Sequence, residues 1–71
     1  MTFVELMSKA DEQQRSKMVA MIVSDGITII AYNSWIKGRR TPMPFYQNQL
    51  RRYVKKIFEL DLTTKELFPK S

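Results

Sequence analysis

The chain contains two glycines, Gly26 and Gly38, and they enclose one short segment, ITIIAYNSWIK. Glycine readily adopts the left-handed backbone conformation that commonly ends a helix, so each glycine predicts a helix end. Thr28 follows the first glycine as a candidate N-cap, and Pro42 stands beyond the second, where it disfavours further helix. We therefore expect a helix up to Gly26, a tight turn, and a second short helix over about 28–37.

Helix signals also frame the two ends of the sequence. Thr2 with Glu5, and Thr63 with Glu66, match the capping box, in which each side chain satisfies a free backbone N–H at a helix start. Leu62 and Leu67 flank the second box as a hydrophobic staple. We therefore expect one short helix at each end of the chain, the first with its apolar side made by Phe3, Val4, Leu6 and Met7.

Three further stretches lie between these signals. The polar residues 8–14 predict a turn or a bend. Apolar residues then recur at helical spacing before Gly26, and we expect the buried side of that helix to consist of Met18, Val19, Ala20 and Ile22. From Pro44 to about Glu59 the same spacing returns, with Leu50 and Ile57 on the core side and Arg51, Arg52, Lys55 and Lys56 on the rest of the surface.

Together these patterns predict an all-α protein of roughly four or five short helices. With 71 residues, the chain has room for one small domain, and domains of roughly 55–65 residues already fold alone. Its composition, 44% hydrophobic and 27% charged, is ordinary for a globular protein. We expect residues 1–71 to form a single domain.

The sequence has no cysteine and no histidine. This excludes disulfides, thiol nucleophiles, imidazole bases and the usual zinc sites. The carboxylates Glu5, Asp11 and Glu12 show no recognisable catalytic spacing. We therefore expect no enzymatic activity, no metal, no cofactor and no small-molecule ligand.

No run of residues approaches the roughly 18 consecutive apolar positions of a membrane span. The opening stretch, MTFVELMSKADEQQR, carries carboxylates where a signal peptide has a cationic end and an apolar run. We expect a soluble, cytoplasmic protein with no membrane partner.

Positive charge is concentrated in one part of the sequence. The net charge is +5, and residues 37–56 contain no carboxylate but seven cations: Lys37, Arg39, Arg40, Arg51, Arg52, Lys55 and Lys56. A basic block of this kind attracts nucleic acid or an anionic membrane surface. A solvated helix surface is an equally good interpretation of the charge alone.

The order of residues around Gly26 indicates a helix-turn-helix, in which Gly26 allows the sharp turn, Ile27 fills the angle between the helices and Thr28 caps the second helix. Its core would run over about 15–38. Ile27 and Tyr32 occupy the positions of a hydrophobic staple. Tyr32 and Trp35 should then face inward with Ile36, leaving residues 29, 30, 33, 34 and 37 nearer the outside.

The segment GITIIAYNSWIKGRRTP resembles the turn and recognition helix of the lambda-repressor/Cro-like helix-turn-helix family, and LTTKELFP resembles the closing segment of such domains. The resemblance rests on the ordered set Gly26, Ile27, Thr28, Tyr32, Trp35, Gly38, Arg39, Arg40 and Pro42. It implies a compact five-helix fold, binding to double-stranded DNA through the major groove, and frequently a homodimer. A small transcriptional regulator of the phage-repressor type, from a prokaryote or a phage, is the function it implies.

On this interpretation the helix over about 28–37 lies in the major groove, and the residues expected to enter it are Thr28, Ile29, Ile30, Asn33 and Ser34. Asn33 could pair with adenine. Cationic and hydroxyl side chains just after these positions would contact phosphates and fix the register without reading sequence: Lys37, Arg39, Arg40 and Thr41. Exposed, solvated side chains are the simpler alternative for Asn33 and for the four cations of the longer helix.

Ile29 and Ile30 leave three interpretations open. They could contact thymine methyl groups, one of them could turn into the core, or they could form an exposed apolar patch for a protein. The last possibility defines an alternative function, a protein–protein interaction module on the same scaffold with only weak, unspecific DNA binding.

Overall fold

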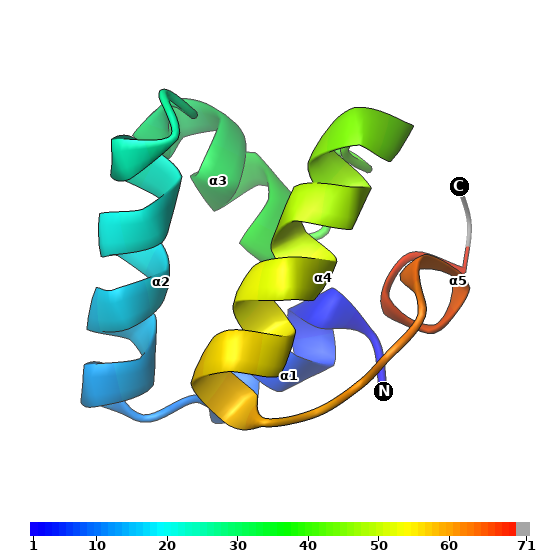
Figure 1. The fold of residues 1–71 in the computed structure, drawn as a ribbon. Helices are drawn as coiled ribbons and strands as arrows, with labels where there is room; N and C mark the ends of the chain where they lie inside the picture. Colours follow the sequence, from blue (N-terminus) through cyan, green and yellow to red (C-terminus); the bar gives the residue numbers. More distant parts are fainter. Residues whose placement is uncertain (70–71) are drawn as a thin grey trace.

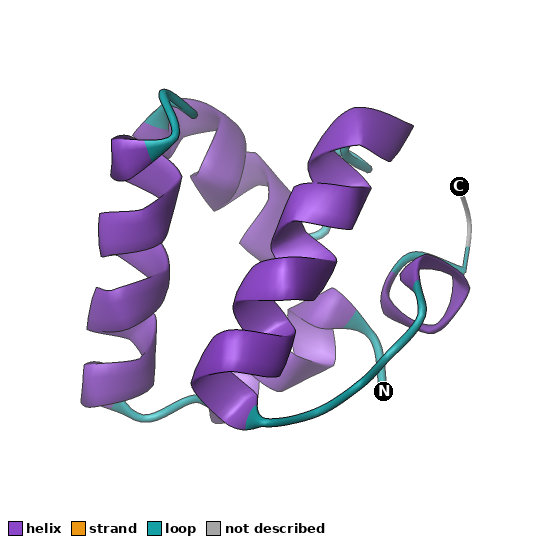
Figure 2. Cartoon of the chain, viewed as in Figure 1, coloured by secondary structure: helices purple, strands orange, loops and turns teal. Residues whose placement is uncertain are grey.

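The structure, a computed structural model, describes residues 1–69, and over these residues the chain folds into five helices with no strand. They are α1 (Phe3–Lys9), α2 (Glu12–Ser24), α3 (Ile29–Ile36), α4 (Pro44–Phe58) and α5 (Thr64–Leu67). The all-α prediction is therefore confirmed. Figure 1 shows α2 and α4 as the two long elements, with α3 and α1 behind them and α5 beside α4. The connections between helices are short except for the loops on either side of α4 (Figure 2).

The core takes side chains from every helix. Phe3 of α1, Met18 of α2, Leu50 of α4 and Leu67 of α5 are all fully buried. Tyr32 and Trp35 bring α3 into the same cluster. The aromatic ring of Phe3 lies 5.4 Å from that of Phe68, so the two ends of the described chain pack together. Burial of apolar side chains is the main term that stabilises such an assembly of short helices.

Both predicted capping boxes are present. Thr2 accepts a hydrogen bond from the N–H of Glu5 while the Glu5 carboxylate accepts one from the N–H of Thr2, and Thr63 and Glu66 repeat the arrangement. These hydrogen bonds hold the pKa of both glutamates below its usual range. The predicted helix ends at the two glycines are also confirmed.

The connection expected within residues 8–14 is present but shorter, and it consists of Ala10 and Asp11. α1 runs to Lys9, and α2 already begins at Glu12. A third capping box starts it, in which Asp11 and Gln14 exchange hydrogen bonds between side chain and backbone. The polar residues on either side of this connection therefore belong to the last turn of α1 or the first turn of α2, and most of them are exposed.

Two apolar residues expected in the core are exposed instead. Val4, on the outer side of α1, is 38% exposed, and Ala20 is an exposed residue of α2. Each helix buries one narrow side. The buried side of α1 consists of Phe3, Leu6 and Met7, and that of α2 consists of Met18 and Ile22. Val4 and Ala20 lie outside these buried sides.

Candidate functional site

The turn between α2 and α3 sets the position of α3. Gly26 adopts a left-handed φ of 79°, and the N–H groups of Gly26 and Ile27 donate to the carbonyls of Val23 and Ile22 at 3.1 and 3.0 Å. These two hydrogen bonds satisfy carbonyls at the end of α2. Ile27 is 7% exposed and lies in the core, so its buried side chain fixes the turn to the rest of the protein.

Thr28 begins α3. Its side-chain oxygen accepts a hydrogen bond from the N–H of Ala31 at 3.2 Å, which confirms the predicted N-cap. Tyr32, at the matching position of the staple, is 4% exposed and lies in the same core cluster as Ile27. Burial raises the pKa of the Tyr32 phenol, although the nearby charge of Arg15 acts the other way.

The buried side of α3 consists of Tyr32 and Trp35, as predicted. The Trp35 ring packs against that of Tyr46 of α4, with ring centres 5.5 Å apart and ring planes tilted by 40°. An α-helix turns by about 100° per residue, so the side opposite these two rings carries a single stripe. The stripe is defined by three residues, and we call it the outer stripe: Ile30, Asn33 and Ser34.

Neither isoleucine turns into the core. Ile30 is 81% exposed at the centre of the outer stripe, and Ile29 is 41% exposed at its side. The interpretation that one of them is a core residue is therefore wrong. The physical reason is the spacing of residues along α3. The rings of Tyr32 and Trp35 occupy the inward side, and Ile30 lies almost opposite them on the helix.

The two polar residues of the outer stripe differ in whether their side chains are already hydrogen-bonded. Asn33 is exposed, and its side-chain amide makes no hydrogen bond within residues 1–69. Ser34 is half-buried, and its hydroxyl donates to the carbonyl of Ile30 at 3.2 Å. Asn33 is thus the polar side chain of this stripe that is free to form new hydrogen bonds.

A loop of cations is fixed to the end of α3. Gly38 has a φ of 72°, and its N–H donates to the carbonyl of Trp35 at 3.1 Å. The backbone N–H groups of Arg39 and Arg40 both point to the carbonyl of Ser34, at 3.0 and 3.4 Å. The side chains of Arg39, Arg40 and Thr41 are exposed. We call residues 37–41 the basic loop.

The far end of this loop is held by a residue that the sequence did not single out. Gln47 of α4 is 5% exposed, and its amide N–H donates to the carbonyl of Pro42 at 2.8 Å. The loop is therefore fixed at one end by α3 and at the other by α4. A glutamine in a helix has no pattern that predicts such a bond, because its partner is a backbone atom of another segment.

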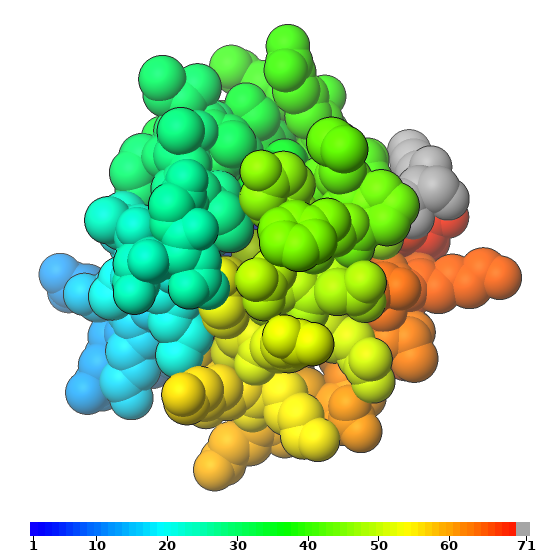
Figure 3. Space-filling view, turned by 45° about the horizontal axis from the view of Figure 1, so that its top comes forward, coloured from blue at the N-terminus to red at the C-terminus, as the bar shows by residue number. Residues whose placement is uncertain are grey.

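Six of the predicted site residues line one groove of about 660 Å³, between α3 and the start of α4. They are Thr28, Ile30, Ser34, Arg39, Arg40 and Thr41. Met43, which is 66% exposed, lines it as well and was not predicted. Figure 3 shows the residues coloured green, which include α3, the basic loop and the start of α4, together over the upper part of the molecule.

The other three predicted residues lie outside this groove. Ile29 and Asn33 are exposed on α3, and Lys37 lines a smaller hollow of about 200 Å³ together with Met7 and Arg15. All three remain at the surface around the same short helix. The predicted set therefore surrounds the outer stripe, with the groove on one side and Lys37 on the other.

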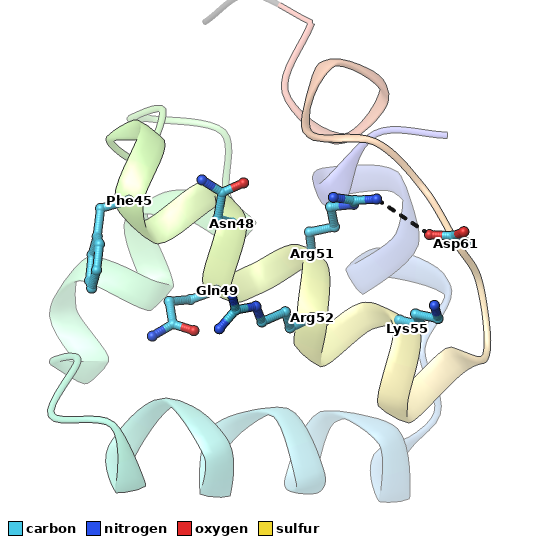
Figure 4. A pocket seen from close by; sticks show the side chains of 7 residues that line it. All are labelled: Phe45, Asn48, Gln49, Arg51, Arg52, Lys55 and Asp61. Atoms are coloured by element: carbon cyan, nitrogen blue, oxygen red, sulfur yellow. Dashed lines mark ion pairs between the residues drawn. The ribbon is translucent and has the colours of Figure 1, made fainter.

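The cations of α4 form a separate region. Arg51 pairs with Asp61 at 3.6 Å and also donates to the carbonyl of Leu62 at 3.1 Å, so it secures the connection to α5. Figure 4 shows Arg51 and Lys55 on the same side of α4 as Asp61, with Arg52 turned toward α2. Arg52 and Lys56 line a hollow between α2 and α4.

Two kinds of site are absent from residues 1–69. No group of three or more acidic side chains is placed to hold a metal ion, and no helix combines the length and apolar character needed to span a membrane. Comparison of the chain with models of protein families, with curated proteins and with solved structures found no match.

Proposed function

We propose that the chain is a sequence-specific DNA-binding domain of the helix-turn-helix type. In this proposal α3 lies in the major groove of double-stranded DNA, with the outer stripe toward the base edges and the basic loop against the phosphates. The observation that carries the proposal is the attachment of the basic loop to α3 through the Ser34 carbonyl, which places cations at a fixed distance from an exposed helix side.

The dimensions favour this arrangement. An α-helix with its side chains is about 10–12 Å across, and the major groove of B-DNA is about 12 Å wide. α3 is only eight residues long, and its inward side is filled by Tyr32 and Trp35. Its outer stripe can therefore approach the bases without disturbing the core.

The charge favours it as well. Lys37, Arg39 and Arg40 flank the end of α3, and no carboxylate occurs between residues 37 and 56. Phosphate contacts from such cations supply most of the affinity of a DNA-binding protein, while groups on the groove side of the helix supply its specificity. Arg39, Arg40 and Thr41 would fix the register, and Thr28, Ile29, Ile30, Asn33 and Ser34 would face the bases.

The test is selection of bound duplexes from a randomised pool at about physiological salt, where purely ionic binding is weakened. An enriched motif of a few base pairs supports the proposal, and a palindromic motif adds a homodimer. Arg40→Ala should then lower affinity nearly equally for all sequences, whereas Asn33→Ala should relax the preference at one base pair. No enrichment in the pool would overturn the proposal.

One observation favours a second candidate. Ile30 is 81% exposed, and Val23, Met43 and Phe45 are also exposed apolar residues, each more than half accessible. A protein partner, or a second copy of the chain, would cover such side chains. Sedimentation that depends on concentration and is abolished by Ile30→Glu would support this function, and a monomer at high concentration would count against self-association.

A further inference from the structure

We infer that α3 reads thymine and adenine, with Ile30 as the residue that recognises the thymine methyl group. The target of this chain should therefore have a core of A·T base pairs. The inference rests on the proposed DNA-binding function and specifies which base pairs its site recognises.

The first argument is what the outer stripe does not contain. Guanine is most often read by two hydrogen bonds from an arginine or lysine, and cytosine by a carboxylate. Ile30, Asn33 and Ser34 provide neither kind of group. Lys37 follows the stripe at the C-cap of α3 and lines the hollow beside Met7 and Arg15, away from the groove that Ile30 lines.

Arg39 and Arg40 line the same groove as Ile30, but their backbone lies in the loop that follows α3. The N–H groups of Arg39 and Arg40 are fixed at the Ser34 carbonyl, beyond the last turn of α3. The basic loop is also held at Pro42 by Gln47. These two arginines therefore extend from the loop after α3, which the proposed complex places against the phosphates, and α3 itself carries no arginine or lysine.

The second argument is the position of Ile30. It is the most exposed of the large apolar residues, at 81%, and it lies at the middle of the outer stripe. It also lines the groove together with Thr28 and Met43, so its side chain is open to a ligand on that side. Thymine is the base that presents a methyl group in the major groove, and an aliphatic side chain recognises it by apolar contact.

The third argument is the pairing of Ile30 with Asn33. The two side chains are one turn apart on the same stripe. The Asn33 amide has no partner within residues 1–69, and an asparagine amide forms two hydrogen bonds with adenine in the major groove. Ser34 is less selective, because its hydroxyl already donates to the Ile30 carbonyl. Ile30, which would contact a thymine methyl group, and Asn33, which would bind adenine, together favour A·T base pairs.

The experiment replaces thymine by deoxyuridine, one position at a time, in the motif obtained from the randomised pool. Uracil keeps the hydrogen-bonding edge of thymine and lacks only its methyl group. For the unmodified protein we expect about a fourfold loss of affinity at one thymine, the ratio that corresponds to one buried methylene-sized group. In Ile30→Ala the same replacement should have no effect.

Two control variants separate this effect from general weakening. Arg40→Ala should bind less tightly overall and keep the fourfold penalty for uracil, because its contact is with phosphate. Ile29→Ala tests whether the neighbouring isoleucine shares the methyl contact. Ile30 is exposed, so its truncation should leave the fold intact, and a circular dichroism spectrum equal to that of the parent checks this.

The outcomes distinguish the inference from the proposed function. A motif in which no thymine is sensitive to uracil, or one made only of G·C pairs, overturns methyl recognition while DNA binding stands. A uracil penalty that persists in Ile30→Ala overturns the role of this residue. An unenriched pool overturns the function and the inference together, and Ile30 is then assigned to a protein contact.

Discussion

The phenol oxygen of Tyr53, in the second half of α4, donates a hydrogen bond to the carboxylate of Asp25, the residue that ends α2. Tyr53 is 7% exposed, so this hydrogen bond connects a buried side chain of α4 to the first residue of the α2–α3 turn. It joins the long basic helix to the element that positions α3. Gly26 and Ile27 complete the turn immediately after this contact.

Replacing Tyr53 by phenylalanine should lower stability by about 1.5 kcal/mol, because a hydrogen bond to a charged group is lost while the ring is kept. In a domain of this size that corresponds to a fall in Tm of about 6–12 °C. Tyr46→Phe is the matched control, since Tyr46 lies on the same helix and its hydroxyl has no partner within residues 1–69. Equal effects of the two variants would show that the Asp25 contact contributes nothing.

The same contact predicts a dependence on alkaline pH. Burial, and then the hydrogen bond to Asp25, raise the pKa of Tyr53 above the value of about 10 that it has in an unfolded chain. The folded state therefore holds this proton more tightly, and the resulting stability is present below pH 10 and is lost as pH rises above it. The difference in Tm between the parent and Tyr53→Phe should shrink above about pH 10. A difference that stays constant to pH 11 would contradict this.

Much of the fold followed from local signals in the sequence. The caps at Thr2, Thr28 and Thr63 and the left-handed glycines act over a single turn, so the residues that form them stand close together in the sequence. The start of α2 is less evident from the sequence, because its capping box pairs Asp11 with Gln14, whereas the usual pattern begins with a serine or a threonine.

The candidate site was less predictable where contacts join distant segments. The exposed position of Ile30 could not be separated from a buried one by spacing alone, because isoleucine is ordinary in either place. Gln47 and Tyr53 hold the basic loop and the turn through partners at Pro42 and Asp25. Such pairs depend on how α4 crosses the other elements, and a single sequence carries no pattern for that.

Gly26 and Gly38 should respond alike to substitution, although their surroundings differ. A Cβ at Gly26 would meet nothing within 4 Å, and one at Gly38 would lie 3.5 Å from Val4, an ordinary contact. The cost is therefore conformational, since φ is +79° and +72°, and each change to alanine should destabilise by about 1–2 kcal/mol.

Asparagine at either position should cost less, because it tolerates this left-handed backbone. Urea denaturation of the four variants checks both statements. A loss several times larger for Gly38→Ala than for Gly26→Ala would mean that the contact with Val4 is too tight and that sterics dominate.

Gln47→Met keeps the length of the side chain and removes the hydrogen bond to Pro42. The carbonyl of Pro42 then loses its buried donor, and we expect a loss of about 1–3 kcal/mol in the free energy of unfolding. Gln49→Met, at a half-buried position of the same helix, is the control and should change stability little. If the two variants have the same denaturation midpoint, the Gln47 bond does not hold the basic loop.

The last prediction compares Arg40 with Arg51, two exposed arginines of the same basic block. If about four cations meet phosphates, log K should fall with log salt at a slope near −3.6, and each cation accounts for about 0.9 of it. Arg40→Ala should therefore reduce the slope by about 0.9. Arg51→Ala should leave it unchanged, because Arg51 pairs with Asp61 and donates to the Leu62 carbonyl. Binding titrations at several salt concentrations measure both slopes. A slope that is reduced for Arg51→Ala and unchanged for Arg40→Ala would indicate that α4, and not the basic loop, contacts the phosphates. It would contradict the proposed placement of α3 as the helix nearest the bases.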